Sequence, residues 1–96
     1  MEKYKCWYGL NGSFGGARDY EIEEFDSGDR AIEYAYNLAC EEYSKYEGTN
    51  FMRTFGQILE EENLDDDVLE DIRKAQDIYE SEREEWLEYR IELIEE

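Results

Sequence analysis

The sequence contains no histidine and no proline, and it has only ten Lys or Arg residues against 28 Asp or Glu. Without histidine the chain lacks the most common general base and the most common metal ligand in proteins. Ser-His or Cys-His nucleophiles and Glu-x-x-His di-iron sites therefore cannot be built. Paired carboxylates would need a cleft that desolvates one of them, and a chain of 96 residues is small for such a cleft. We expect no enzyme activity, no metal and no other cofactor.

Cysteine and long apolar runs are also scarce. Cys6 and Cys40 stand far apart and form no CxxC motif, so neither a zinc site nor a disulfide framework is indicated. Free cysteine is among the most buried residue types, and we predict that both are reduced and buried. No segment approaches the ~20 apolar residues of a membrane span, and the first residues lack the apolar centre of a signal peptide. These absences predict a protein of the cytosol.

What the chain has in excess is negative charge, −18 at pH 7. Self-repulsion of this size opposes folding, so its retention suggests that the electric field has a use. The sign argues against direct binding to DNA, RNA or an anionic membrane, because each of these attracts cations. An apolar fraction of 41% and an aromatic fraction of 16% still predict a folded chain. A basic protein is the partner that this field would attract.

The N-terminal part predicts a β-hairpin. Residues alternate between apolar and polar from Lys3 to Leu10 and again, less regularly, from Tyr20 to Phe25. The glycine-rich segment between them, Asn11 to Ala17, suits a tight reversal and does not match a phosphate-binding GxxxxGK[ST] loop. Phe14 lies near the tip with nothing predicted beneath it, which makes it a candidate contact for a partner.

A helix is predicted from the cap residue Ser27 to Gly48. Its apolar residues recur every three or four positions, and three small ones let it approach the hairpin closely: Ala31, Ala35 and Ala39. A second helix is predicted from Phe51 to Glu62, capped by Thr49 or Asn50. It ends with Glu60, Glu61 and Glu62 at its negative dipole end, an unfavourable arrangement that suggests a functional reason.

A third, long and acidic helix is predicted from Asp65, as N-cap, to Glu96. Asp66 and Asp67 then occupy its first turn, and a calcium loop is excluded because the residues that follow lack the required ligand and glycine spacing. The apolar stripe of this helix is interrupted at residues 81–85. Beyond that break the apolar side chains spread around the helix without an evident neighbour, so residues 86–96 are predicted to hold an interface.

The predicted fold is α+β: a hairpin packed by a helix (ββα), followed by two further α-helices, in a single domain of residues 1–96. Residues 1–48 form its core and carry a net charge of −6, whereas residues 49–96 form an acidic helical half with −12. From Asp65 to Glu96 the net charge is −10 over roughly 45 Å of helix, about one charge per 4.5 Å. This density is of the same order as that of a nucleic-acid strand, about one charge per 3.4 Å. In the alternative interpretation, these acids only form a solvated helix face with intrahelical ion pairs.

A small acidic chain without histidine or proline, with stretches such as EEENLDDDVLEDI and ESEREEWLE, resembles the phage-encoded inhibitors of host defence. Anti-CRISPR proteins and other DNA mimics are examples, and the resemblance is one of general composition over the whole chain. It implies a stoichiometric inhibitor in the host cell cytosol that binds the nucleic-acid channel, or the site reading the protospacer-adjacent motif, of an effector nuclease.

The predicted binding surface joins acids to apolar anchors. The acids are Glu60, Glu61, Glu62, Asp65, Asp66, Asp67, Glu80, Glu84, Glu85 and Glu88, and the anchors are Phe14, Trp86 and Tyr89. Two other interpretations remain open. In the first, the protein is structural or regulatory and forms a homodimer through a helical seam of Ile72, Tyr79, Trp86 and Leu93. In the second, the tyrosines and the glycine loop sequester a small signalling molecule, although an acidic protein is a poor host for an anionic nucleotide.

Overall fold

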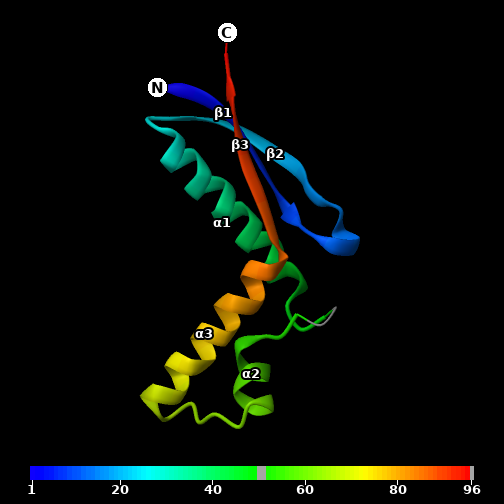
Figure 1. Cartoon of the computed structure of the whole chain (residues 1–96), viewed down its shortest axis with the longest axis vertical. Coiled ribbons are helices and arrows are strands. Elements are labelled where there is room, and N and C mark those ends of the chain that lie inside the picture. The colour runs from blue at the N-terminus through cyan, green and yellow to red at the C-terminus, as the bar shows by residue number, and fades with distance from the viewer. Residues whose placement is uncertain (50–51, 96) are drawn as a thin grey trace. The chain divides into compact units, whose positions relative to one another are not determined.

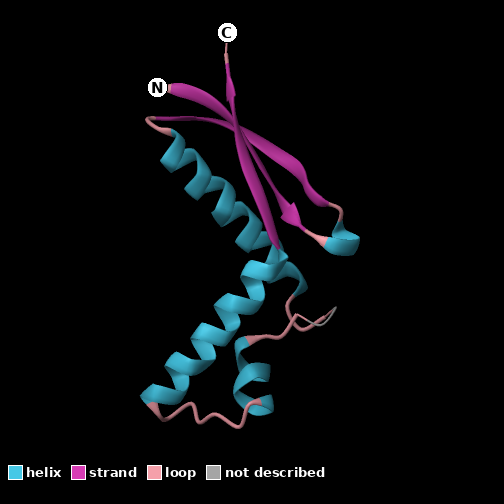
Figure 2. Cartoon of the chain, in the orientation of Figure 1, coloured by secondary structure: helices cyan, strands magenta, loops and turns pink. Residues whose placement is uncertain are grey.

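The computed structural model describes residues 1–49 and 52–95, and it confirms the α+β class (Figures 1 and 2). The predicted helix-capping role of Asn50 and the helix start at Phe51 lie outside the described residues. The strands are β1 (Glu2–Leu10), β2 (Gly16–Phe25) and β3 (Leu87–Ile94), and the helices are α1 (Gly28–Tyr46), α2 (Phe55–Glu61) and α3 (Leu69–Trp86), with a 3-10 turn at Gly12–Phe14.

The chain divides into two compact units. The first unit contains Met1–Ser44 and Trp86–Glu96, and the second contains Lys45–Glu85. The C-terminal residues, predicted to extend an acidic helical half, therefore belong with the hairpin. Each unit has fourteen acids and five bases and so carries a net charge of −9, but the second is the shorter and has the higher charge density.

The predicted hairpin is confirmed. β1 and β2 pair antiparallel from Glu2 opposite Phe25 to Leu10 opposite Gly16, so β2 begins four residues earlier than predicted. The register shifts between Tyr8 and Leu10, where Ala17 and Arg18 of β2 lie opposite the single residue Gly9, so β2 has a bulge. A Cβ atom at Gly9 would overlap the carbonyl oxygen of Gly16, so the two strands can approach this closely only because Gly9 has no side chain.

The prediction that the last helix continues to Glu96 is wrong. α3 ends at Trp86, and Leu87–Ile94 is a strand that pairs antiparallel with β1, from Leu87 opposite Leu10 to Ile94 opposite Lys3. The sequence LEYRIELI alternates apolar and polar residues with the period of two that is typical of a strand. The helix was predicted because Glu, Leu and Arg are good helix formers, and that tendency masked the alternation. Pairing with the free edge of β1 decides in favour of the strand. The sheet order is β2-β1-β3, with β1 in the centre.

Helix α1 packs across one face of this sheet (Figure 1). Tyr4 and Cys6 of β1 meet Ala31 and Ala35 of α1 in a buried cluster, with Phe25, Tyr34 and Ile91 at its margin. The alanines at positions 31, 35 and 39 are fully buried, so they lie on the face of α1 that is turned away from solvent. The Ser27 hydroxyl accepts a hydrogen bond from the Arg30 amide at 3.4 Å, as expected of the cap.

Both cysteines are free, as predicted. Cys6 is fully buried and its thiol donates to the Ala31 carbonyl at 3.7 Å, but Cys40 is only half-buried, which corrects its predicted burial. Burial, with the nearby charge of Glu21 and Glu23, raises the pKa of the Cys6 thiol. Cys6 is therefore a small core residue and not a reactive thiolate.

In the second unit the helices begin later than predicted. Thr54 caps α2 in a capping box: its hydroxyl accepts from the Gln57 amide at 3.1 Å, and the Gln57 side chain accepts from the Thr54 amide at 2.8 Å. α3 begins at Leu69, so Asp65 is not its N-cap. A carboxylate oxygen of Asp65 instead accepts from the Asp67 amide at 2.9 Å, in the turn before the helix. No helix in the described parts of the chain has the length and apolar content needed to cross a membrane.

Candidate functional site

The densest negative charge lies at the end of α2 and in the loop that follows it. Residues 60–67 hold six acids and no base, and all six acids are exposed. We call this segment the acidic turn. Its backbone is fixed by a Schellman motif: Asn63 has a φ of 55°, its amide donates to the Glu60 carbonyl at 3.3 Å, and the Leu64 amide donates to the Leu59 carbonyl at 2.8 Å.

The acidic turn borders an open hollow of about 590 Å³ in the second unit. Leu59, Leu64 and Gly56 provide its apolar part. Asn63 and three acids of the turn provide its polar part: Glu60, Asp65 and Asp66. Both leucines are partly buried, and they take the positions that are in contact in a Schellman motif. The hollow therefore combines an apolar floor with an anionic rim.

The three aspartates of the turn concentrate this charge. One carboxylate oxygen from each of Asp65, Asp66 and Asp67 lies within 4.8 Å of the others. The Asp65 amide donates to the Asp71 carboxylate at 3.0 Å, which connects the turn to the first turn of α3. Among the described residues, no Lys or Arg forms an ion pair with these three aspartates or with Glu60.

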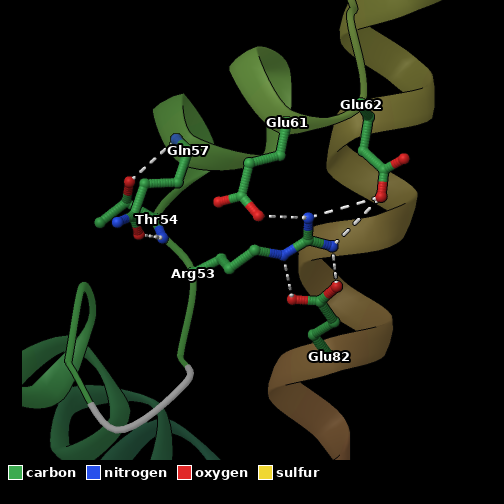
Figure 3. A network of polar contacts seen from close by, with 6 residues as sticks. All are labelled: Arg53, Thr54, Gln57, Glu61, Glu62 and Glu82. Carbon is green, nitrogen blue, oxygen red and sulfur yellow. Dashed lines mark hydrogen bonds and ion pairs between the residues drawn. The ribbon is translucent and has the colours of Figure 1, made fainter.

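Arg53 binds three other acids of the second unit (Figure 3). Its guanidinium forms ion pairs with Glu61 at 3.6 Å and Glu62 at 3.4 Å, at the end of α2, and with Glu82 of α3. The Arg53 side chain is 22% exposed, and its hydrogen bond to Glu82 raises the pKa of the guanidinium. The unfavourable arrangement predicted for the glutamates that end α2 is therefore compensated by Arg53 at Glu61 and Glu62. Sequence reasoning missed Arg53 because its partners lie up to 29 residues away.

The remaining predicted acids of the second unit, Glu80, Glu84 and Glu85, are exposed on α3. Glu84 pairs with Arg83 at 3.8 Å. α3 has seven acids and three bases along its 18 residues, which is one net charge per ~7 Å of helix. The predicted rod with about one charge per 4.5 Å does not exist, because the segment that was to supply its second half is a strand. The acids follow one another most closely along the chain in the acidic turn, not along α3.

The predicted anchors and Glu88 belong to the first unit, whereas the other nine acids belong to the second. The rings of Phe14 and Trp86 meet edge to face with 5.9 Å between centroids, so the premise that nothing lies beneath Phe14 is wrong. The Asn11 amide also donates to the Trp86 carbonyl at 2.9 Å, which closes the loop end of the hairpin. Glu88 accepts from the Ala17 amide at 3.2 Å. Tyr89 packs against Tyr36 with 5.3 Å between centroids and remains 36% exposed.

The helical seam of the alternative interpretation is also wrong. Ile72 and Tyr79 lie on α3, but Trp86 is the last residue of that helix and Leu93 belongs to β3. The four residues therefore do not share one helix face. A homodimer, if formed, must use another surface.

A cluster that the sequence did not predict consists of aromatic and basic side chains on the sheet face opposite α1. Trp7 and Tyr20 are cross-strand neighbours with 4.7 Å between ring centroids. Arg90 lies 4.4 Å from the centre of the Trp7 ring, and Lys5 lies 4.5 Å from that of Tyr20. The signal in the sequence was the alternation of Lys3, Lys5 and Trp7 opposite the core residues of β1. Lys5 and Arg90 are thus held over aromatic rings of the sheet.

Comparison of the chain with protein-family models, with curated proteins and with solved structures found no match. The function must therefore be inferred from the surface chemistry of this chain. The most distinctive feature of this surface is the acidic turn with the hollow beside it.

Proposed function

We propose that this protein is a stoichiometric inhibitor that binds the basic nucleic-acid-binding surface of another protein, in the manner of an anti-CRISPR or DNA-mimic protein acting on an effector nuclease. One observation carries the proposal: six exposed acids within eight consecutive residues, beside a hollow with a leucine floor. Grooves that bind phosphates present Lys and Arg side chains, and those side chains match both parts of this site.

The inhibition requires no chemical step. A Lys or Arg side chain of the partner would lay its methylene groups on Leu59 and Leu64 and direct its charged end to Glu60, Asp65 and Asp66. The groove would then be occupied by carboxylates where nucleic acid would place phosphates. The Schellman motif holds the turn in one conformation before binding, which reduces the entropy lost on association.

The rest of the second unit supports this binding at longer range. Its net charge of −9 attracts a basic partner, and Glu80, Glu84 and Glu85 add exposed acids along α3. Arg53 faces three glutamates of its own unit, so its charge is directed inward. Four of the six acids of the acidic turn, Glu60 and the three aspartates, form no ion pair with a base in the described chain and so keep their negative charge for a partner.

The test is an inhibition assay on guide-loaded effector nucleases with a target duplex. We expect cleavage to stop at about one inhibitor per nuclease, and a duplex carrying the protospacer-adjacent motif to compete with inhibitor binding. Binding should weaken steeply between about 0.05 and 0.5 M salt because screening acts on exposed charges. Binding that is unchanged at about 1 M salt, or that occurs equally well with DNA in the groove, would contradict the proposal.

A matched pair of variants localises the surface. Replacing Glu60→Gln, Asp65→Asn and Asp66→Asn together should weaken binding by at least about tenfold, equivalent to ~1.4 kcal/mol. The control replaces Glu2→Gln, Glu33→Gln and Glu41→Gln, which removes the same charge from exposed positions of the first unit. Equal weakening by both triple variants would show that only net charge matters, and not the acidic turn.

A further inference from the structure

The outer edge of β3 is the strongest unassigned feature of the first unit. β3 is an edge strand in the order β2-β1-β3, and its pairing with β1 runs without a register shift from Leu87 to Ile94. It contains no proline, so its outward amides and carbonyls form a regular row. Tyr89 and Leu93 are 36% and 43% exposed along it. Such an edge is suited to pairing with another strand.

We propose that β3 pairs antiparallel with β3 of a second copy of this chain, about a two-fold axis through Ile91, to form a continuous six-stranded sheet. This surface is in the first unit and shares no residue with the acidic turn, and the pairing does not depend on the proposed function. It also differs from the helical seam considered above, because the contacts are those of a strand edge.

The pattern of charged and apolar side chains along β3 favours this register. A two-fold axis perpendicular to the sheet keeps each face on its own side, so residues of the same parity stand opposite one another. With Ile91 on the axis, Arg90 lies opposite Glu92 of the second copy, and the pair occurs twice. On the other face Tyr89 lies opposite Leu93 of the second copy, and the two Ile91 side chains meet. Opposite charges and apolar side chains are thus matched from Tyr89 to Leu93, and Glu88 lies opposite Ile94 of the second copy at each end.

The neighbouring registers fit less well. An axis through Arg90 places the two arginines opposite each other and Glu88 opposite Glu92 of the second copy, so like charges meet. An axis through Tyr89 gives Arg90–Glu88 pairs, but it overlaps only residues 87–91 of the strand. The axis through Ile91 overlaps residues 88–94 and covers both of the more exposed apolar side chains.

The net charge of each copy, −18, opposes this association at low ionic strength. Screening lengths fall from about 30 Å at 0.01 M salt to about 10 Å at 0.1 M. The dimer should therefore strengthen as salt is added. This dependence is opposite to that expected for binding of a basic partner to the acidic turn, so the two associations are distinguishable in one titration.

Sedimentation equilibrium of the full chain at several concentrations and salt levels tests the proposal. We expect the apparent mass to rise from that of the 11.6 kDa monomer toward the dimer as protein and salt increase. Arg90→Glu and Glu92→Arg should each weaken the dimer by at least about tenfold, because each places like charges opposite one another twice. An equimolar mixture of the two variants should restore it, and so should both changes in one chain.

Controls with the same charge changes lie on β2, at the other edge of the sheet: Arg18→Glu and Glu24→Arg. They should leave the dimer within about twofold of the wild type. Arg90 also lies over Trp7, so if Arg90→Glu fails to fold, Glu92→Arg and Glu92→Gln carry the test. A wild-type chain that stays monomeric at about 1 mM in ~0.5 M salt would overturn the proposal. A dimer unaffected by Glu92→Arg would overturn this register.

Discussion

Tyr34 on α1 has a pKa that is changed by the acidic residues around it. Its hydroxyl donates to the Glu21 carboxylate on β2 at 2.7 Å, and its ring packs against Phe25 with 5.3 Å between centroids. The hydrogen bond to Glu21, partial burial and nearby acids together raise the pKa of Tyr34 to about 12. The neutral phenol is therefore the form that the fold favours.

Tyr34 predicts a loss of stability at high pH. Its pKa is higher in the folded chain than in the unfolded one, so its contribution is fully present below pH ~10 and is lost as the pH rises toward 12. Urea unfolding at pH values between 8 and 12 should show a steeper decline for the wild type than for Tyr34→Phe. In ultraviolet titrations, the difference between the two proteins should show one phenol that ionises near pH 12. A difference centred near pH 10 would contradict the assignment.

At the scale of elements, the Arg53 cluster connects the end of α2 to α3 within the second unit (Figure 3). The short α2 has only one fully buried side chain, Ile58, so polar contacts have a large share in fixing it. Without Arg53, the carboxylates of Glu61, Glu62 and Glu82 would remain near one another with no cation between them.

We expect Arg53→Ala to lower the free energy of unfolding by about 1–2 kcal/mol, because charge-assisted hydrogen bonds are lost and like charges remain. Arg73→Ala is the control, since Arg73 is exposed on α3 and has no ion pair within the described chain. It should change stability by less than about 0.5 kcal/mol. Chemical denaturation measures both, and a double-mutant cycle with Glu82→Gln isolates the pair. Equal effects of the two arginine variants would refute the structural role of Arg53.

The elements also show where sequence reasoning succeeds. Local signals were sufficient for the hairpin and for α1: alternation in β1, glycines at the reversal, the Ser27 cap and the three buried alanines. β3 could not be recognised in the same way, because Leu87–Ile94 has good helix formers and no Gly or Pro between it and α3. Its state is decided by pairing with β1, a partner that lies near the other end of the chain. The fold class was predictable, and the third strand was not.

For the candidate site, composition located the acids but not their environment. All ten predicted acids are exposed, yet only the geometry separates Glu61 and Glu62, which pair with Arg53, from the four acids of the turn that do not. The hollow beside the turn was not foreseen, since it depends on the left-handed conformation of Asn63 and the resulting approach of Leu64 to Leu59. The aromatic anchors were chosen for lacking neighbours, and tertiary contacts supply those neighbours.

At the scale of the whole molecule, the net charge of −18 predicts that salt stabilises the fold. Raising sodium chloride from about 0.01 to 0.5 M should increase stability by about 1–2 kcal/mol, which corresponds to roughly 5–10 °C in Tm for a chain of this size. Thermal unfolding at low protein concentration measures the effect without contribution from association. An uncharged osmolarity control, such as sucrose, separates screening from solvent exclusion. A Tm that does not change with salt would mean that the acids do not oppose folding.

The position of β1 between β2 and β3 has a consequence for the order in which the chain can fold. Paired residues of β1 and β3 are between 77 (Leu10 to Leu87) and 91 (Lys3 to Ile94) residues apart. During synthesis the hairpin and α1 emerge first, but one edge of β1 has no neighbour until the whole second unit and then β3 have left the ribosome. Closing so long a loop is slow, so the first unit is completed last. Until β3 pairs with it, β1 has a free edge on which another strand could pair wrongly.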